Sequence, residues 1–234
     1  MTETKQDAPR KLTIDIWSDV MCPWCLIGYG QLQKGLALLD GEIEADIRWR
    51  PFELNPDMPP EGEEQAAHIQ RKYRRSAEEG AAIRGQMKAI ADKAGVSMEY
   101  RGEEPAPPAM MRNTFLAHKL LAHALDSYGA QKQTELKLAL FEAHFNRRRD
   151  VGDRGVLLDI AEEHGLVRGA AERAFDDDQL GERVRAEERA AWDMNVTGVP
   201  ATLVEGKFLI PGAQEPETYA NALRRVADRF PAAA

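Results

Sequence analysis

The two cysteines of this chain, Cys22 and Cys25 in "SDVMCPWC", stand three positions apart at the junction between two predicted elements. Upstream of them, the run "LTIDIW" at residues 12–17 alternates its side chains with the period of a strand. Downstream, leucines recur at helical spacing between Leu32 and Leu39. Random placement of two cysteines would give this spacing in about one case in a hundred, so the arrangement needs a reason. This pair therefore restricts the choice of fold and chemistry more than any other feature of the sequence.

The remaining strand signals lie at the two ends of the chain. A second strand is expected around Ile47 and Trp49, after a crossover long enough to make it parallel to the first. Strand character returns only in "PATLVEGKFLIPG", where Glu205-Gly206 predicts a tight turn between two short strands. A last amphipathic helix is expected from about Pro216 to Phe230. Between the two groups of strands the pattern is helical.

The order β-α-β, helical block, β-β-α predicts an α/β fold, namely a thioredoxin-like fold with a large inserted all-helical domain. The expected boundaries are residues 10–55 for the first part of the thioredoxin-like domain and 63–192 for the inserted helical domain. Residues 195–230 are expected to form the second part of the thioredoxin-like domain. One inserted helix is expected to start near Asp153 and to end at Gly165, a residue that suits a left-handed cap.

The composition is that of an ordinary soluble globular protein, with 43% apolar and 30% charged residues. A net charge of −8 argues against a general binder of nucleic acids or anionic membranes, because both polyanions would be repelled. The N-terminal run "MTETKQDAPRK" does not resemble a signal peptide, and no stretch approaches the ~20 apolar residues of a membrane-spanning helix. The expected location is the cytoplasm, where thiols are kept reduced. A close cysteine pair is there more often catalytic or metal-binding than a structural disulfide.

A redox interpretation explains the cysteine pair by the helix that follows it. Cys22 is expected at the N-cap and Pro23 at the first helical position, which proline favours. Unpaired N–H groups and the helix dipole would stabilise a thiolate at Cys22, lowering its pKa from about 8.5 to roughly 3.5–7.5. Cys25 lies one turn along, where it can attack a mixed disulfide on Cys22. Cys22 is therefore predicted to be the exposed thiol and Cys25 the covered one.

Two other interpretations of the pair remain open at this point. In a zinc site, His118 and His123 would supply the second half, but 92 residues separate Cys25 from His118. Two helical residues five positions apart also point about 140° away from each other. Alternatively, both thiols are buried and inert. The close spacing favours redox chemistry over both, so no metal site is expected.

The sequence resembles the DsbA family of thioredoxin-fold oxidoreductases, in particular its FrnE-like branch, which is related to 2-hydroxychromene-2-carboxylate isomerase and the kappa-class glutathione transferases. The resemblance covers about residues 12 to 225 and is carried by "SDVMCPWCLIG", "WRPFELNP", "NTFLAH", "TGVPATLV" and "IPGAQ". It implies that Cys22 is the nucleophile and Cys25 the resolving cysteine. Val199-Pro200 matches the family's cis-proline loop, which lies against the cysteine pair and offers backbone groups to a substrate.

The resemblance implies further candidates for the substrate-binding site. Pro23 and Trp24 lie between the cysteines, and an exposed aromatic there is available to contact a substrate. Asn113 and His118 occupy a family-like segment, where Asn113 also suits an ordinary helix N-cap and His118 either faces the cleft or has a structural role. The Pro-Trp dipeptide departs from the Pro-His of the strongly oxidising periplasmic members. We therefore do not expect this protein to have the strongly oxidising reduction potential of those members.

The predicted function is thiol–disulfide exchange with protein or small-molecule substrates, as a reductase or isomerase. The alternative is a glutathione-dependent isomerase or transferase of the kappa type, although those relatives typically carry serine at the first active position. A third hypothesis is a peptide-binding chaperone that uses the same groove. No cofactor is expected beyond the redox-active disulfide, with glutathione as a candidate co-substrate. The expected partners are disulfides and thiols, with no nucleic acid and no membrane, and the expected state is a monomer or homodimer.

Overall fold

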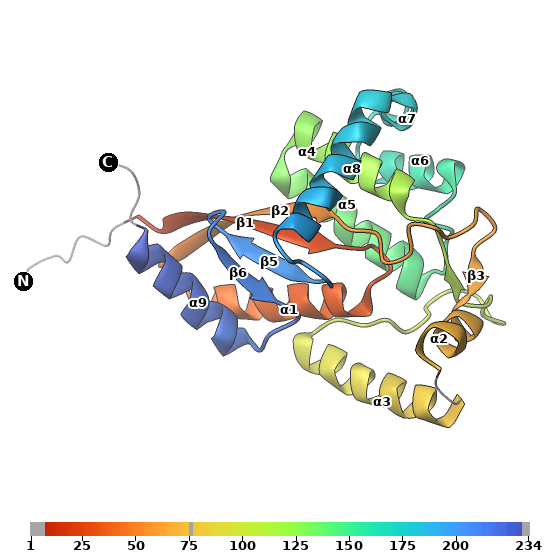
Figure 1. Cartoon of the computed structure of the whole chain (residues 1–234), viewed down its shortest axis with the longest axis horizontal. Coiled ribbons are helices and arrows are strands. Elements are labelled where there is room, and N and C mark those ends of the chain that lie inside the picture. The colour runs from red at the N-terminus through yellow and green to blue at the C-terminus, as the bar shows by residue number, and fades with distance from the viewer. Residues whose placement is uncertain (1–7, 75–76, 231–234) are drawn as a thin grey trace, which may run out of the picture.

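A computed structural model describes residues 8–74 and 77–230 of the chain (Figure 1). The first elements are β1 (Arg10–Ser18), α1 (Pro23–Ala37) and β2 (Ile43–Pro51). β1 and β2 are parallel, with Ile14 opposite Ile47, as the length of the crossover predicts. The apolar residues Leu12, Ile14 and Ile16 of β1 are buried at every second position, so one face of the strand packs on the core.

The second part of the sheet comes from the C-terminal end of the chain. β5 (Ala201–Val204) and β6 (Phe208–Pro211) form an antiparallel hairpin, and α9 (Pro216–Arg229) follows. The turn between the strands contains Glu205 at φ 53° and Gly206 at φ 63°, the left-handed conformation that the predicted tight turn requires. β5 pairs antiparallel with β1, so the strand order is β2-β1-β5-β6. The two ends of the chain thus meet in one sheet.

The stretch between β2 and β5 is mostly helical, but it also contains a short strand pairing. β3 (Glu63–Glu64) and β4 (Met110–Met111) are antiparallel, a two-residue ladder that the expectation of an all-helical insert left out. The helices are α2 (Gln65–Tyr73), α3 (Ala77–Ala94), α4 (Phe115–Tyr128), α5 (Ala130–Phe141), the π-helix η1 (Glu142–Asn146), α6 (Arg154–Glu163), α7 (Arg168–Asp176) and α8 (Asp178–Asp193). α6 follows the capping residue Asp153, and Gly165 beyond its end has φ 81°, as predicted.

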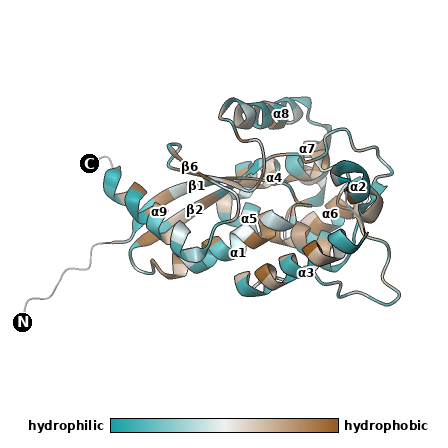
Figure 2. Cartoon of the chain, turned by 60° about the horizontal axis from the view of Figure 1, so that its bottom comes forward, coloured by the Kyte–Doolittle hydropathy of each residue, from teal (hydrophilic) through white to brown (hydrophobic). Residues whose placement is uncertain are grey.

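These elements pack around two main apolar clusters. α1 and α9 cover one face of the sheet and share a core with it, which includes Ile14 and Leu223 (Figure 1). A second core lies among α4, α5, α6 and α7 and includes Leu120 and Leu157. Apolar residues follow the strands β1 and β2, whereas α8 is mostly hydrophilic (Figure 2).

The inserted stretch does not pack as one group of helices. α3 lies against α1, where Ala91 and Ala94 contact Ile27. α4 to α7 surround their own core, and α4, α5 and α8 contact β2. The division of the chain into the three predicted segments stays a prediction. No helix within the described residues is long and apolar enough to cross a membrane.

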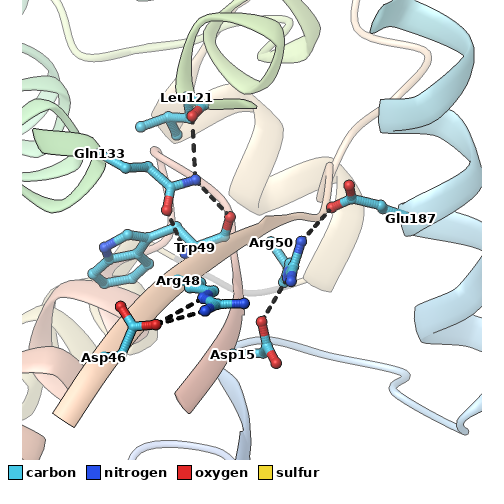
Figure 3. A network of polar contacts seen from close by, with 8 residues as sticks. All are labelled: Asp15, Asp46, Arg48, Trp49, Arg50, Leu121, Gln133 and Glu187. Atoms are coloured by element: carbon cyan, nitrogen blue, oxygen red, sulfur yellow. Dashed lines mark hydrogen bonds and ion pairs between the residues drawn. The ribbon is translucent and has the colours of Figure 1, made fainter. Parts of the chain in front are cut away.

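A network of polar contacts attaches the inserted helices to the outer edge of β2 (Figure 3). The side-chain amide of Gln133 on α5 accepts a hydrogen bond from the Trp49 N–H at 2.9 Å and donates one to the Trp49 carbonyl at 2.9 Å. The same amide nitrogen donates to the Leu121 carbonyl of α4 at 3.2 Å. Arg50 pairs with Asp15 of β1 at 2.7 Å. This network fixes α5, and every side chain that it carries, against the end of the sheet.

Candidate functional site

The cysteine pair lies at the N-terminus of α1, at the end of β1. Cys22 is the N-cap with extended backbone, and Pro23 stands at the start of the helix, as the sequence predicts. The Cys25 N–H donates to the Cys22 carbonyl at 3.1 Å, which closes the first turn. This turn brings the two cysteines to 3.3 Å from each other.

The two thiols are free and both lie beneath the surface. Cys25 is 0% exposed and Cys22 3% exposed, so the expectation of an exposed Cys22 is wrong. The carbonyl oxygen of Val199 lies against it, and the Cys22 thiol donates to that oxygen at 3.6 Å. A substrate disulfide therefore has to approach through the Val199 loop to reach Cys22.

The Val199-Pro200 peptide bond is cis, as the family resemblance implies. The Pro200 ring packs on Gly28 in α1, where a Cβ atom would come within 3.0 Å of the proline Cγ. Glycine at this position lets the loop approach the helix closely, and the approach places the Val199 carbonyl over Cys22.

The structure separates the other predicted substrate-binding residues into two groups. Trp24 is 39% exposed and Pro23 is partly exposed, so both present surface beside the thiols. The Asn113 side chain accepts from the Phe115 N–H at 3.0 Å and donates to the Pro56 carbonyl at 3.2 Å. The N-cap of α4 is Thr114 and not Asn113, and the two bonds of Asn113 join the start of that helix to the loop after β2.

His118 lies in the interior, 2% exposed, and offers no surface to a substrate. Burial and the positive charge of Lys137 lower its pKa well below the usual value, so the ring is neutral at physiological pH. Its Nε2 atom is buried without a hydrogen-bond partner among the described residues. A hollow of about 110 Å³ beside His118 is lined by Arg50 and Gln133 among others, and neither cysteine lines it.

Asp19 is a buried carboxyl group three residues before Cys22. It accepts hydrogen bonds from the Met21 N–H at 3.2 Å and the Leu54 N–H at 2.8 Å, and thereby holds the loop between β1 and α1. Burial raises its pKa, against the lowering effect of the Leu54 amide and the Lys137 charge. Asp19 thus organises the loop and adds an ionisable group next to the thiols.

Lys137 on α5 is the site residue that the sequence did not reveal. Its side chain is 0% exposed, and its ammonium donates to the Ser18 carbonyl at 3.3 Å. Burial lowers its pKa to about 8, while negative charge on Cys25, Asp19 and Cys22 raises it. A signal was present, because "LKLALF" at 136–141 surrounds this lysine with apolar residues and leaves it no polar helix face.

The pKa values of the two thiols shift in opposite directions. Burial raises the pKa of Cys25, but the Cys22 thiol and the Lys137 ammonium lower it, and the net direction is downward. The pKa of Cys22 is raised, first by its hydrogen bond with Cys25 and then by burial. The sequence analysis expected the thiolate at Cys22. The two thiols titrate as a unit, and the hydrogen bond between them is the first cause of the shift at Cys22 and the largest lowering cause at Cys25.

Metal ligation is the other chemistry that the sequence raised for cysteines. Within residues 8–74 and 77–230, no group of three or more His, Cys, Asp or Glu side chains could hold a metal ion. What the site offers instead is a pair of free thiols 3.3 Å apart beside a buried lysine, which is suited to disulfide exchange.

Comparisons with known proteins place this geometry in context. Residues 13–224 match the family model of the DSBA-like thioredoxin domain. The uncharacterized protein YwbO of Bacillus subtilis (strain 168) is 28% identical over 215 residues, covering 90% of this chain and 94% of the relative. The probable DsbA oxidoreductase SCO1869 from Streptomyces coelicolor superposes with a TM-score of 0.81 and 27% identity, covering 95% of this chain and 93% of that one.

A more distant structure is the cytosolic disulfide reductase DsbM from Pseudomonas aeruginosa, which has also been solved with GSH. It is 20% identical with a TM-score of 0.60, covering 94% of this chain and 100% of the other, and at this identity it shows the shared fold. The predicted fold class, a thioredoxin-like α/β fold with a helical insertion, is confirmed.

Proposed function

Since this chain belongs to the DsbA-like thioredoxin family, we propose that it is a thiol–disulfide oxidoreductase that works through Cys22 and Cys25. The observation that carries the proposal is the pair itself: two free thiols 3.3 Å apart, at a helix N-terminus and against the carbonyl of Val199. Family membership supports redox chemistry in general, and the pair supplies the two sulfurs that disulfide exchange needs.

The reduced pair carries one proton between the sulfurs of Cys22 and Cys25, and this proton takes part in the disulfide exchange. The Cys22 sulfur attacks a substrate disulfide, its proton passes to the Cys25 thiolate, and one substrate thiolate leaves. Cys25 then gives up that proton to the leaving thiolate and attacks the Cys22 sulfur. The second substrate sulfur departs as a thiolate, and the Cys22–Cys25 disulfide remains. Two electrons pass from the pair to the substrate, and the one proton leaves with the products.

We further assign the protein to the reducing direction, in the cytoplasm, within the FrnE-like branch. The Pro-Trp dipeptide supports this direction, because it lacks the histidine that helps strongly oxidising relatives to hold a thiolate. DsbM, which shares the fold, is described as a cytosolic disulfide reductase and has been solved with GSH, which makes glutathione our candidate electron donor. Protein and small-molecule disulfides are the proposed substrates, with Trp24 and the Val199 loop as the contact surface.

The test compares three variants in the reduction of a mixed-disulfide peptide with glutathione as the donor. Cys22→Ser should lose turnover at least about a thousandfold, because no other sulfur can start the exchange. Cys25→Ala should accumulate a covalent adduct on Cys22, detected by mass spectrometry. Full turnover by Cys25→Ala would favour the glutathione-dependent isomerase or transferase instead. Activity that survives in the Cys22→Ser, Cys25→Ser double variant would exclude thiol chemistry and favour a chaperone.

The direction needs a separate measurement, the equilibrium potential of the pair against a glutathione series. A reductase should lie near the value of thioredoxin, about −270 mV, and an oxidase near that of DsbA, about −120 mV. A value at the oxidising end would contradict the assigned direction while leaving the exchange chemistry intact.

A further inference from the structure

We propose that Trp192 and Met194, where α8 ends, form an apolar subsite for the polypeptide that carries the substrate disulfide. The subsite selects substrates that have an apolar side chain a few residues from the reacting cysteine. The inference deepens the proposed function and rests on it, because it names a substrate class. Disulfides within polypeptides use the subsite, whereas small disulfides react at the thiols alone.

Trp192 and Met194 are large apolar side chains that the fold leaves open. Trp192 is 54% exposed and Met194 is 39% exposed. The Trp192 ring packs on the buried Phe52 ring, with the ring centres 5.4 Å apart. This contact holds the indole in place while more than half of the residue stays open to solvent. A fixed, accessible aromatic ring of this kind is suited to anchor an apolar side chain of a partner.

The ring on which Trp192 packs lies at the end of the sheet from which the thiol loop departs. Pro51, the last residue of β2, is opposite Ser18, the last residue of β1. Phe52 follows Pro51 directly. Phe52 and Val199 belong to one apolar cluster, and the carbonyl of Val199 accepts from the thiol of the nucleophilic cysteine. The exposed indole is therefore continuous, through this cluster, with the loop that covers the thiol.

The same apolar cluster extends along the sheet face opposite to α1 and α9. Leu203 and Leu209 are opposite each other in the β5–β6 hairpin, are half-buried and pack on the cluster of Phe52. Their neighbours Val204 and Ile210 belong to the core that the sheet shares with α1 and α9, on the other face. The accessible apolar surface thus has room for more than one side chain of a substrate.

The stretch between α8 and Pro200 gives an extended substrate a path to the subsite. It connects Met194 to the loop over Cys22. Gly198 in this stretch is exposed, and no atom outside its chain neighbours lies within 4 Å of the place where a side chain would begin. A substrate strand that adds to the backbone beside Pro200 can therefore run along this stretch toward Met194.

The charge of the surface favours apolar polypeptides over small charged thiols. Residues 192–199 carry one charged side chain, that of Asp193, which repels carboxylates. Pro23 and Trp24 add uncharged surface beside the thiols. An apolar side chain of a polypeptide buries area against such a surface, whereas the two carboxylates of glutathione gain no partner there.

The test is a single-turnover assay of the reduced protein without an electron donor. The substrates are a mixed-disulfide peptide with leucine about three residues from its cysteine, the same peptide with serine there, and bis(2-hydroxyethyl) disulfide. Trp192→Ser should slow the reaction of the leucine peptide about tenfold and leave that of the small disulfide unchanged. Trp192→Phe should restore most of the rate. The matched control is Leu38→Ser, which removes a 51% exposed side chain at the far end of α1 and should change neither rate.

Equal slowing of the leucine peptide and the small disulfide would show that Trp192 acts on the thiols, and would overturn the inference. An unchanged rate for the leucine peptide, or equal rates for both peptides in the wild-type protein, would also overturn it.

A binding measurement in the wild-type protein separates this inference from the proposed function. The indole NMR signal of Trp192 should shift when a leucine peptide that carries serine in place of cysteine is added, and an unmoved signal would sink the idea. A shift in a protein that exchanges no disulfides would contradict the proposed function and not the subsite.

Discussion

Two buried lysines of the inserted helices lie in interiors of different kinds. Lys119 on α4 donates to the carbonyl oxygens of Phe175 and Asp177, both at 2.8 Å, near the end of α7. Lys137 on α5 donates to one carbonyl and is otherwise surrounded by aromatic rings, thiols and a carboxyl group. The first lysine is held by two carbonyl dipoles that do not change during a reaction, and its charge also interacts with the Asp176 carboxylate. The second depends on groups whose charge changes with redox state and pH.

This difference shows how to distinguish a structural buried charge from a functional one. Backbone carbonyls cannot titrate, so a buried lysine whose hydrogen bonds all go to them has a structural role between helices. A lysine surrounded by ionisable groups gains or loses its partner whenever those groups change. Substitutions at Lys119, His144 and Asp19 test this distinction.

The largest expected effect is on stability, at Lys119. Lys119→Met leaves the carbonyls of Phe175 and Asp177 without their donor and should lower the free energy of unfolding by about 3 kcal/mol. Lys137→Met should cost less than half as much, because the methionine side chain packs favourably between the Trp49 and Phe141 rings. Urea unfolding at pH 7.5 measures both. A larger loss at Lys137 than at Lys119 would reverse the comparison.

His144 is a third buried basic residue, and it differs from the two lysines because burial favours its neutral form. Burial lowers the pKa of His144 to about 4 from 6.5, with Arg112 acting in the same direction. A group with a depressed pKa in the folded state contributes stability above pH 6.5, and this contribution is lost as the pH falls toward 4. The loss from His144 alone should be about 2 kcal/mol at pH 5. His144→Gln should show a correspondingly smaller decline between pH 7.5 and 5 in urea unfolding, and an undiminished decline would contradict the assignment.

The smallest effect is expected at Asp19, and its sign is informative. Asp19 adds negative charge near the thiols and thereby raises the pKa of Cys22. Asp19→Asn should therefore lower the pH midpoint of thiolate formation in the reduced pair by less than about one pH unit. Lys137→Met removes a positive charge and should shift the same midpoint upward. Thiolate absorbance against pH measures both variants side by side. Shifts of the same sign would show that disturbed packing, and not charge, moves the midpoint.

The sequence predicted the elements whose signals are local. The strand before Cys22, the proline at the start of α1 and the turn at Glu205-Gly206 depend on neighbours within a few residues, and all three are present. The cis bond before Pro200 could not come from the dipeptide itself. It was found because a family motif carried the information.

The parts that failed depend on contacts between distant segments. Cys22 is covered by a carbonyl 177 residues further along the chain. Lys137 is separated by 119 residues from the carbonyl that it binds, and in a helical pattern a lysine ordinarily indicates a solvated face. His118 lay in a family-like segment, yet at 2% exposed it presents no surface to a substrate, whereas Asn113 in the same segment is partly exposed. Burial of this kind is decided by which helix packs on which strand.

The amide of Gln133 has a consequence for the exposed edge of the sheet. β2 and β6 are the two edges of the four-stranded sheet, and an edge strand with free backbone groups invites pairing with another molecule. On β2, both backbone groups of Trp49 are already occupied by Gln133 (Figure 3). A foreign strand would have to displace this amide before it could add to the sheet. One buried glutamine thus closes the Trp49 position of the β2 edge to strand addition, a purpose for which other proteins use prolines, bulges or surface lysines.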